Sequence, residues 1–507
     1  MNKKNLLLLG FILLKFYLQF ILISPEYDLH RDEYLHLDQA KHLAWGYQSV
    51  PPVTSWISFI ISLLGNGVFW IKFFPALFGA LTVLVVWKTI EELNGNLIAL
   101  LIGATGVLFS ILLRLNTLYQ PNSLDVLCWT ALFFLFLKYI NTEKPTWLYW
   151  SAAVFAIGFL NKYNIAFLVL GLVPAILLTP QRKIFLKKEL YLAALVGLLL
   201  ILPNLIWQYQ NNFPVVHHMN QLAKLQLVNV NRFDFLKNQV LFFMGALPVI
   251  LLGLYALIFY KPFKLYTVFF WSIIFTLSVF LWFRAKDYYA IGLYPVYIAF
   301  GAVYIQHISQ TGWKRALVPV VLVLPILVFI RMYTIAFPNK TPEYILQHQD
   351  KYKALGMLRW EDGKDHDLPQ DFADMLGWSE LALKVDQVYT EINEPVNTLV
   401  LCDNYGQAGA INYYSRTGVR AVTFNADYID WFELDKNYVN LIRVKEREER
   451  NTEWRETSPY FKTSVIADSV TNKFAREFGT TIFSFKGATI NVNERIEAEI
   501  KEVKSYR

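Results

Sequence analysis

Cysteine is nearly absent from this chain, and charged side chains are scarce. The two cysteines, Cys128 and Cys402, lie far apart and show no metal-ligand spacing, so we expect neither a disulfide framework nor a cysteine-based metal site. Charged residues make up 17% of the 507 residues, against the roughly 25% usual in soluble domains. Hydrophobic residues make up 55%, and the mean hydropathy is +0.34. This composition excludes a chain that is soluble throughout.

Acidic residues are rare in the first two thirds of the chain. Residues 1–336 carry 25 Lys/Arg and 12 Asp/Glu, a net charge of +13. Residues 337–507 carry 22 Lys/Arg and 28 Asp/Glu, a net charge of −6. Such a break in charge indicates a domain boundary. We expect a transmembrane catalytic domain over 1–336 and a small soluble α/β domain over 337–507. In the second part, 396–401 and 419–424 are rich in β-branched residues, and 372–388 has the pattern of an amphipathic helix.

Long apolar runs are abundant in the first part. A helix that crosses the hydrocarbon core needs roughly 20 mostly apolar residues. Eleven ranges are candidates: 5–24, 68–90, 97–114, 122–140, 147–161, 164–179, 190–207, 239–260, 266–283, 288–306 and 316–336. The first run has no small-residue cleavage site, so we interpret it as a retained membrane helix. The expected fold is mainly α, a polytopic helical bundle of about 11 and at most 13 transmembrane helices, followed by the α/β domain.

The basic residues of the short loops fall on alternate sides of these spans. The positive-inside rule then predicts a cytoplasmic N-terminus and an extracytoplasmic, periplasmic domain 337–507 in a bacterial inner membrane. The loop 25–67 is expected outside. Its stretch 53–64 is apolar but too short to span, which favours a helix lying in the membrane interface.

Unusual residues gather on the predicted outer face in a fixed order. The pair Asp32-Glu33 follows the first span, and Ala44-Trp45-Gly46-Tyr47 and Pro51-Pro52-Val53-Thr54-Ser55-Trp56 come soon after it. Asp125 opens the fourth span, and Lys286-Asp287-Tyr288-Tyr289 opens a late one. This ordered set, over about residues 5–300, resembles the GT-C superfamily. It is most similar to bacterial relatives of the dolichyl-phosphate-mannose protein mannosyltransferases and of the lipid A aminoarabinose transferase (glycosyltransferase families 39 and 83).

The resemblance implies a glycosyltransferase that moves a hexose or pentose from a polyprenyl-phosphate donor, with inversion at the sugar C1. It places the catalytic acid in the first outer loop, where Asp32 lies. The aminoarabinose transferases have an Arg-Tyr pair close after the Asp-Glu, whereas this chain has Tyr34-Leu35-His36. The acceptor, whether lipid, glycan or protein, is therefore left open, as is the sugar. We expect no nucleic-acid partner.

Three carboxylates are candidate catalytic residues: Asp32, Glu33 and Asp125. A carboxylate beside the acceptor hydroxyl can act as a base or orient it. Asp32 is the predicted base, with Glu33 assisting; the structural alternative for both is a solvated helix start. An ionised Asp125 at the start of a span is costly and usually has a functional partner, although it can also cap the helix after Pro121.

Cations and aromatic rings form the second candidate set. The leaving phosphate requires positive charge. Arginine supplies it through a planar guanidinium that can make two parallel hydrogen bonds, and lysine supplies it as a point charge. The candidates are Lys286, Arg284, Arg114 and Lys162, each of which can instead snorkel to the interface. Weaker candidates for substrate contact are Tyr34, Tyr47, Trp56, Tyr288 and Tyr289. His217-His218 has no carboxylate or cysteine beside it and makes a poor metal site. No metal or other cofactor is required, although the resemblance leaves room for a divalent cation.

Other functions compete with this one. A transporter or flippase of lipid-linked sugars is the main alternative, but no internal repeat is visible and the charges gather at one face. A non-enzymatic assembly partner and a family member without activity are further alternatives.

Overall fold

The computed structural model describes residues 3–225 and 227–505, and the chain divides into two compact units. Unit 1 consists of Met1–Ile23, Val50–Thr54 and Asn66–Phe337. Unit 2 consists of Ser24–Ser49, Ser55–Gly65 and Pro338–Arg507. The division between Phe337 and Pro338 is one residue from the boundary between 336 and 337 that the charge pattern gave. Most of the predicted outer loop 25–67, however, groups with the C-terminal part instead of with the helical bundle.

Helix α2 (Arg31–Asp38) shows why the loop belongs to unit 2. It packs against α21 (Tyr405–Tyr414), with Tyr34 completely buried between the two. The Tyr34 ring lies 5.8 Å from the rings of Tyr413 and Tyr414 and 5.9 Å from that of Trp378. Burying so large a ring holds the two segments together, since full burial of a large apolar side chain contributes about 1.5–3 kcal/mol.

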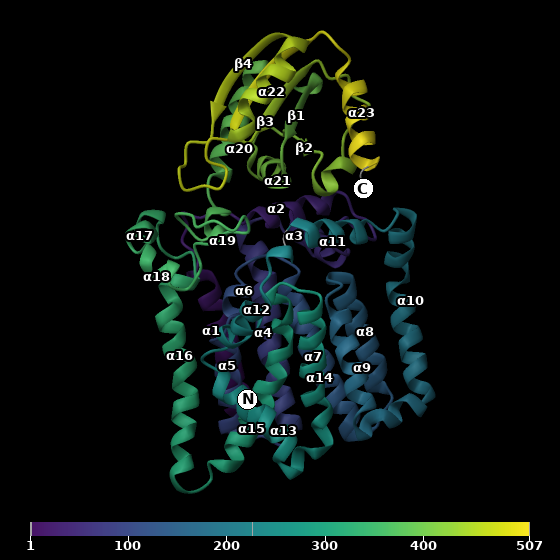
Figure 1. Cartoon of the computed structure of the whole chain (residues 1–507), viewed down its shortest axis with the longest axis vertical. Coiled ribbons are helices and arrows are strands. Elements are labelled where there is room, and N and C mark those ends of the chain that lie inside the picture. The colour runs from purple at the N-terminus through teal and green to yellow at the C-terminus, as the bar shows by residue number, and fades with distance from the viewer. Residues whose placement is uncertain (1–2, 226, 506–507) are drawn as a thin grey trace. The chain divides into compact units, whose positions relative to one another are not determined.

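Unit 1 is a bundle of helices (Figure 1). Its principal helices are α1 (Lys3–Ile21), α4 (Val68–Glu92), α5 (Leu97–Leu108), α7 (Asn122–Thr142), α8 (Thr146–Asn161), α9 (Ile165–Leu177), α10 (Lys188–Gln210), α12 (Arg232–Phe242), α13 (Leu247–Phe259), α14 (Thr267–Trp282), α15 (Tyr294–Ile308) and α16 (Leu317–Ala336). Shorter pieces are α6 (Leu112–Leu115), α11 (Pro214–Leu225) and the 3-10 turn η5 (Asp287–Leu293). The apolar helix α3 (Val53–Leu63) is divided between the two units.

The helical fold class is confirmed, but the number of full spans is lower than eleven. Among the described residues, seven helices are long and apolar enough to cross a membrane, or nine if each of two bent pairs forms one span. The bends, 107° after α9 and 102° between α12 and α13, shorten the straight segments. Helix α5 has 12 residues and α8 has 16, below the roughly 20 that a straight crossing requires.

Burial separates inner from outer helices of unit 1. In the span Asp287–Ile308, which contains α15, 83% of the most apolar stretch is buried. The corresponding shares are 11% for the span that contains α16 and 22% for α10. The exposed faces of these two outer helices carry leucine and valine. Small residues let the inner helices approach closely. A Cβ at Gly301 of α15 would lie 1.8 Å from the Val249 carbonyl oxygen of α13, so only glycine fits there.

Unit 2 is an α/β domain around a five-stranded sheet of order β2-β1-β3-β5-β4. The strands are β1 (Thr398–Cys402), β2 (Ala421–Thr423), β3 (Asn440–Lys445), β4 (Phe461–Ser469) and β5 (Thr481–Ala488). Strands β2, β1 and β3 are parallel, and Val400 of β1 lies opposite Ala421 of β2 and Ile442 of β3. Strand β5 pairs antiparallel with β3, and β4 pairs antiparallel with β5. The two strands expected from the sequence are β1 and β2.

Helices cover the sheet of unit 2 on both faces. Leu399 and Leu401 of β1 point to a core shared with Val492 and Ile496 of α23 (Val492–Ser505). Helices α20 (Trp378–Ile392) and α21 pack on the sheet and on each other. Remaining helices of the unit are α17 (Pro342–Gln347), α18 (Gln349–Lys353), α19 (Gln370–Ala373) and α22 (Arg450–Thr457).

Candidate functional site

Helix α2 begins with a capping box that fixes the direction of its two acidic residues. The His30 ring Nδ1 accepts from the Asp32 backbone N–H at 3.2 Å, and the His30 backbone N–H donates to Glu33 Oε2 at 2.7 Å. Glu33 is consequently turned inward and completely buried. The Asp32 side chain keeps 37% of its surface exposed. The geometry therefore gives Glu33 a capping role and leaves Asp32 accessible.

A group of polar residues in unit 2 surrounds Asp32; we call Asp32, His30, Arg31, Asp374 and Tyr405 the Asp32 cluster. The Tyr405 hydroxyl donates to Asp32 Oδ1 at 2.7 Å, and the Arg31 guanidinium lies 4.7 Å from the Tyr405 ring centre. His30 Nε2 is 3.8 Å from Asp374 Oδ2. Burial raises the pKa of the Asp32 carboxyl, but His30, Arg31 and the Tyr405 hydrogen bond outweigh it and hold that pKa below its ordinary value.

The Asp32 cluster lies where sheets of this kind commonly bind ligands. Tyr405 opens α21, which begins after a short connection from the end of β1. The Asn404 side chain caps this helix by accepting from the Gln407 N–H at 3.1 Å. Strand β1 is flanked by β2 on one side and β3 on the other, so its carboxyl end is a topological switch point. Crevices outside such points are the usual ligand sites of parallel sheets.

Two glycines in α21 make the approach to α2 possible. A Cβ at Gly409 would lie 2.7 Å from the Tyr34 Cβ, and one at Gly406 would lie 3.3 Å from the Arg31 Cβ. Side chains at either position would push α2 and α21 apart. The segment Tyr405-Gly406-Gln407-Ala408-Gly409 is thus the sequence signal for this contact, although Tyr405 itself was not among the predicted site residues.

A second polar group lies in unit 1, and we call Asp125, Asn164, Trp129, Lys162 and Asn122 the Asp125 cluster. Asp125 is buried in the first turn of α7, where Oδ1 accepts from the Trp129 indole N–H at 3.0 Å. Its Oδ2 accepts from the Asn164 amide at 2.9 Å. Both oxygens of the carboxylate have partners, as burial in an apolar bundle requires.

The segment Asn161-Lys162-Tyr163-Asn164 separates α8 from α9 and is tied to the start of α7. Asn161 donates to the Pro121 carbonyl at 2.8 Å, and Lys162 Nζ donates to Asn122 Oδ1 at 2.6 Å. The connection between α8 and α9 thereby places the half-buried Lys162 beside the start of α7.

Lys162 also meets the late segment that the sequence singled out. Its ammonium lies 4.3 Å from the ring centre of Tyr289 and 5.1 Å from that of Tyr288, and these two rings are in edge contact at 4.8 Å. Asn164 donates to the Tyr289 carbonyl at 2.9 Å, and Lys286 lies near enough to interact electrostatically with Lys162. Asp125, Lys162, Lys286, Tyr288 and Tyr289 therefore come together; Asn122, Asn164 and Trp129 were not predicted.

The remaining predicted residues occupy varied positions. Arg114, in α6, donates to Thr117 Oγ1 at 2.6 Å, and Arg284 is exposed in the turn after α14, with a φ of 51°. In unit 2, Tyr34 and Tyr47 are buried and serve packing; the Tyr47 hydroxyl donates to the His42 carbonyl at 3.0 Å. Trp56 is half-buried against Trp45 at 5.4 Å. The rings of Tyr34 and Tyr47 fill the interior of unit 2, and substrate contact by either residue stays an untested prediction.

Among the described residues, no group of three or more His, Cys, Asp or Glu side chains is arranged to hold a metal ion. His217 and His218 lie on α11, and both cysteines are buried and free.

Comparison with known proteins connects this geometry to a family. Residues 49–207 match the family described as dolichyl-phosphate-mannose-protein mannosyltransferase. The lipid A galacturonosyltransferase RgtD of Rhizobium johnstonii is 27% identical over 212 residues, which cover 40% of this chain and 43% of that relative. The aligned part is thus less than half of the relative's length.

Two solved structures share the fold over nearly the whole chain. ArnT from Cupriavidus metallidurans bound to undecaprenyl phosphate superposes with a TM-score of 0.61 at 14% identity, covering 94% of this chain and 97% of that one. The apo state of the same protein gives a TM-score of 0.59 with the same coverage. At this identity the likeness establishes the architecture, a membrane bundle followed by an α/β domain. The family match over residues 49–207, the sequence relative and the shared architecture make the chain similar to GT-C glycosyltransferases, with the same order of a helical bundle and an α/β domain.

Proposed function

We propose that the chain transfers a hexose or pentose from a polyprenyl-phosphate carrier to a lipid, glycan or protein acceptor at the outer face of a bacterial inner membrane. The observation that carries this proposal is Asp32, a partly exposed carboxylate held ionised by Tyr405, His30 and Arg31. The family match over residues 49–207 and the galacturonosyltransferase relative support the reaction class.

In the proposed reaction, an acceptor hydroxyl oxygen attacks C1 of the donor sugar from the face opposite the phosphate. The bond between C1 and the phosphate oxygen breaks, and its electron pair leaves with the polyprenyl phosphate. A single displacement inverts C1 and requires no second nucleophilic carboxylate, unlike the pair used by retaining hydrolases.

Asp32 takes the proton that the acceptor hydroxyl loses. A carboxylate of low pKa suffices, because the hydroxyl becomes strongly acidic as its oxygen bonds to C1. Its low pKa also keeps Asp32 ionised at any physiological pH. Glu33 acts by positioning: its bond to the His30 backbone fixes the first turn of α2 and hence the direction of Asp32.

The cations of unit 1 are assigned to the donor. The leaving phosphate gains negative charge as the bond breaks, and Lys162 with Lys286 supplies positive charge where the start of η5 meets the α8–α9 break. Asp125 holds Asn164 and thus the position of this break. Arg114 and Arg284 are additional candidates for the phosphate. The cytoplasmic N-terminus and the periplasmic location of unit 2 stay predictions, and so does the expectation that no divalent cation is required.

The proposal is tested by incubating membranes that contain the wild type or Asp32→Asn with a mixed pool of polyprenyl-phosphate sugars. Loss of each donor is followed by mass spectrometry. We expect the wild type to consume one donor and Asp32→Asn, expressed at the same level, to consume none. Equal consumption by both would remove Asp32 from the mechanism. Movement of labelled lipid between leaflets without donor loss would instead establish a transporter.

A further inference from the structure

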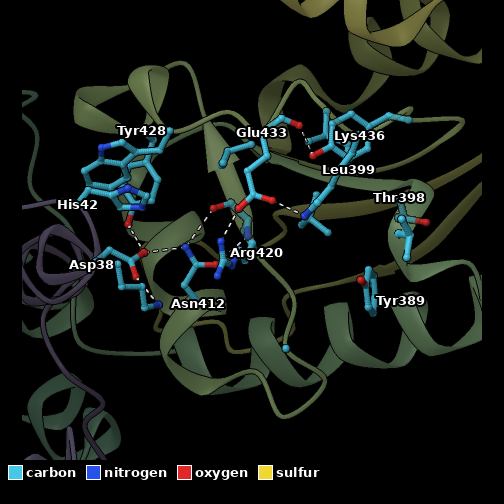
Figure 2. A pocket seen from close by; sticks show the side chains of 18 residues that line it. Asp38, His42, Tyr389, Thr398, Leu399, Asn412, Arg420, Tyr428, Glu433 and Lys436 are labelled. Atoms are coloured by element: carbon cyan, nitrogen blue, oxygen red, sulfur yellow. Dashed lines mark hydrogen bonds and ion pairs between the residues drawn. The ribbon is translucent and has the colours of Figure 1, made fainter. Parts of the chain in front are cut away.

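Unit 2 contains a cavity of about 440 Å³ that the proposed transfer does not use. It lies at one edge of the sheet, against β1 and β2, and is closed by the end of α2, by α21 and by the segment 428–438 (Figure 2). Its size is within the roughly 300–1,000 Å³ of small-molecule sites. The lining combines charged, aromatic and apolar side chains.

One wall of this cavity is held rigid by Asp38. Its Oδ2 accepts from the Asn412 amide at 2.6 Å and from the Tyr428 hydroxyl at 2.8 Å, and its Oδ1 accepts from Lys41 at 3.0 Å. Asn412 is fixed in turn to β2, because its Oδ1 accepts from the Ala421 N–H at 2.7 Å. The Asp38 carboxylate is buried. Such a satisfied network positions the neighbouring groups without an occupant.

Three cations are among the residues that line the cavity: Lys41, Arg420 and Lys436. Their side chains are 58%, 72% and 40% exposed. Arg420 and Lys436 both donate to Glu433, and Lys41 donates to Asp38. A guanidinium has five N–H donors and an ammonium three. Each cation therefore retains donors beyond its carboxylate partner, and the three outnumber the two acids.

An aromatic face completes the cavity. The rings of His42 and Trp431 are stacked, 4.3 Å apart with an angle of 9°, and Tyr428 meets Trp431 edge-on at 4.7 Å. Leu399 and Val422 add apolar surface from the sheet. Flat rings pack against the C–H face of a sugar, while neighbouring charged donors bind its hydroxyl and acidic groups. Inorganic phosphate could bind the cations, but it would not contact the aromatic rings or fill the volume of the cavity.

We propose that this cavity binds an anionic saccharide, a sugar that carries a carboxylate or a phosphate. Arg420 and Lys436 bind the acidic group, and the His42–Trp431 pair lines the ring of the sugar. Binding here is independent of Asp32, so the inference goes beyond the proposed transfer reaction.

Isothermal titration calorimetry of the full-length protein in detergent tests this proposal, with glucuronate, glucose 6-phosphate, glucose and inorganic phosphate as probes. We expect one of the two anionic sugars to bind at least about tenfold more tightly than glucose or phosphate. Arg420→Gln should weaken it about tenfold, the effect of one lost charge-assisted hydrogen bond. Trp431→Ala should weaken it by a similar factor, because the ring face that packs on the sugar is lost. Arg447→Gln, an exposed arginine of the same unit outside the cavity, is the matched control.

Equal binding of phosphate and the anionic sugars would reduce the cavity to a general anion site and overturn the proposal. So would the absence of binding by every probe, or undiminished binding in Arg420→Gln. Lys436→Gln serves as a second variant if Trp431→Ala does not fold. Asp32→Asn should still bind the sugar, which separates a failure of this inference from a failure of the transferase assignment.

Discussion

The Tyr405 hydroxyl donates a 2.7 Å hydrogen bond to Asp32 Oδ1, joining residues 373 positions apart in the sequence. This contact links the start of α2 to the carboxyl end of β1 and fixes one oxygen of the carboxylate. Because the bond is made to the ionised form, it contributes directly to the low pKa of Asp32.

Tyr405→Phe should move the acidic limb of the pH–rate profile to higher pH. Losing the Tyr405 hydroxyl, a hydrogen-bond donor, destabilises the ionised Asp32 carboxylate, so the pKa of Asp32 rises. Activity is then lost at a higher pH as the pH falls. We expect a shift of about one pH unit, since about 1.4 kcal/mol corresponds to one unit. The measurement is kcat/KM for the consumed donor between about pH 4 and 8. The matched variant Tyr460→Phe should leave the limb in place; an unchanged limb in Tyr405→Phe would contradict the coupling.

Lys162→Gln should impair use of the donor. Removing the ammonium beside Tyr288 and Tyr289 takes away a charge assigned to the phosphate, worth about 1.5–3 kcal/mol, so kcat/KM should fall about tenfold to a hundredfold. Lys138→Gln is a matched control, because Lys138 also lies beside an aromatic ring, Trp147, and pairs with Glu92. Steady-state kinetics in proteoliposomes measures both. Equal kinetics in the two variants would exclude Lys162 from donor binding.

Glu33→Gln and Glu33→Ala separate a positioning role from a catalytic one. Glutamine can accept the same hydrogen bond from the His30 N–H, so Glu33→Gln should keep most of the activity. Glu33→Ala removes the cap and should cost about 1 kcal/mol of stability. Activity and thermal unfolding are measured on the same preparations. A complete loss of activity in Glu33→Gln with unchanged stability would show that the negative charge itself takes part.

Gly301→Ala should destabilise unit 1. The added Cβ would overlap the Val249 carbonyl oxygen and force α13 and α15 apart, at a cost of about 1–3 kcal/mol. Gly10→Ala in α1 is the control, because a Cβ there meets nothing within 4 Å. Thermal unfolding can be followed with a thiol-reactive dye, since Cys128 and Cys402 are free and buried. Equal midpoints for the two variants would refute the close packing of these helices.

The sequence was sufficient to predict the fold class, because apolar runs and charge asymmetry are local properties. The helix in each predicted span exists, but the bends after α9 and between α12 and α13 could not be foreseen. They depend on packing against other helices. The same limit applies to α2: its acidic pair was visible, but its attachment to α21 depends on Tyr34 entering the interior of unit 2.

Candidate residues were predictable where their type is unusual for their surroundings. Asp125 and Lys162 stand out as charges in apolar sequence, and the structure brings them together. Their partner Asn164 was inconspicuous, although it joins Asp125 to the Tyr289 carbonyl. Tyr405 and the cavity around Asp38 were not predicted, because tyrosines are abundant in this chain and contacts across hundreds of residues leave no local pattern.

The most direct test of the central claim is transfer by the purified full-length chain in liposomes that contain the one donor it consumes. Release of polyprenyl phosphate is measured for the wild type, Asp32→Asn and Asp350→Asn, the last an exposed carboxylate of α18 in the same unit. The account predicts release by the wild type and Asp350→Asn and a loss of at least about a hundredfold in Asp32→Asn, the usual scale for a general base. Release by Asp32→Asn at the wild-type rate would contradict it.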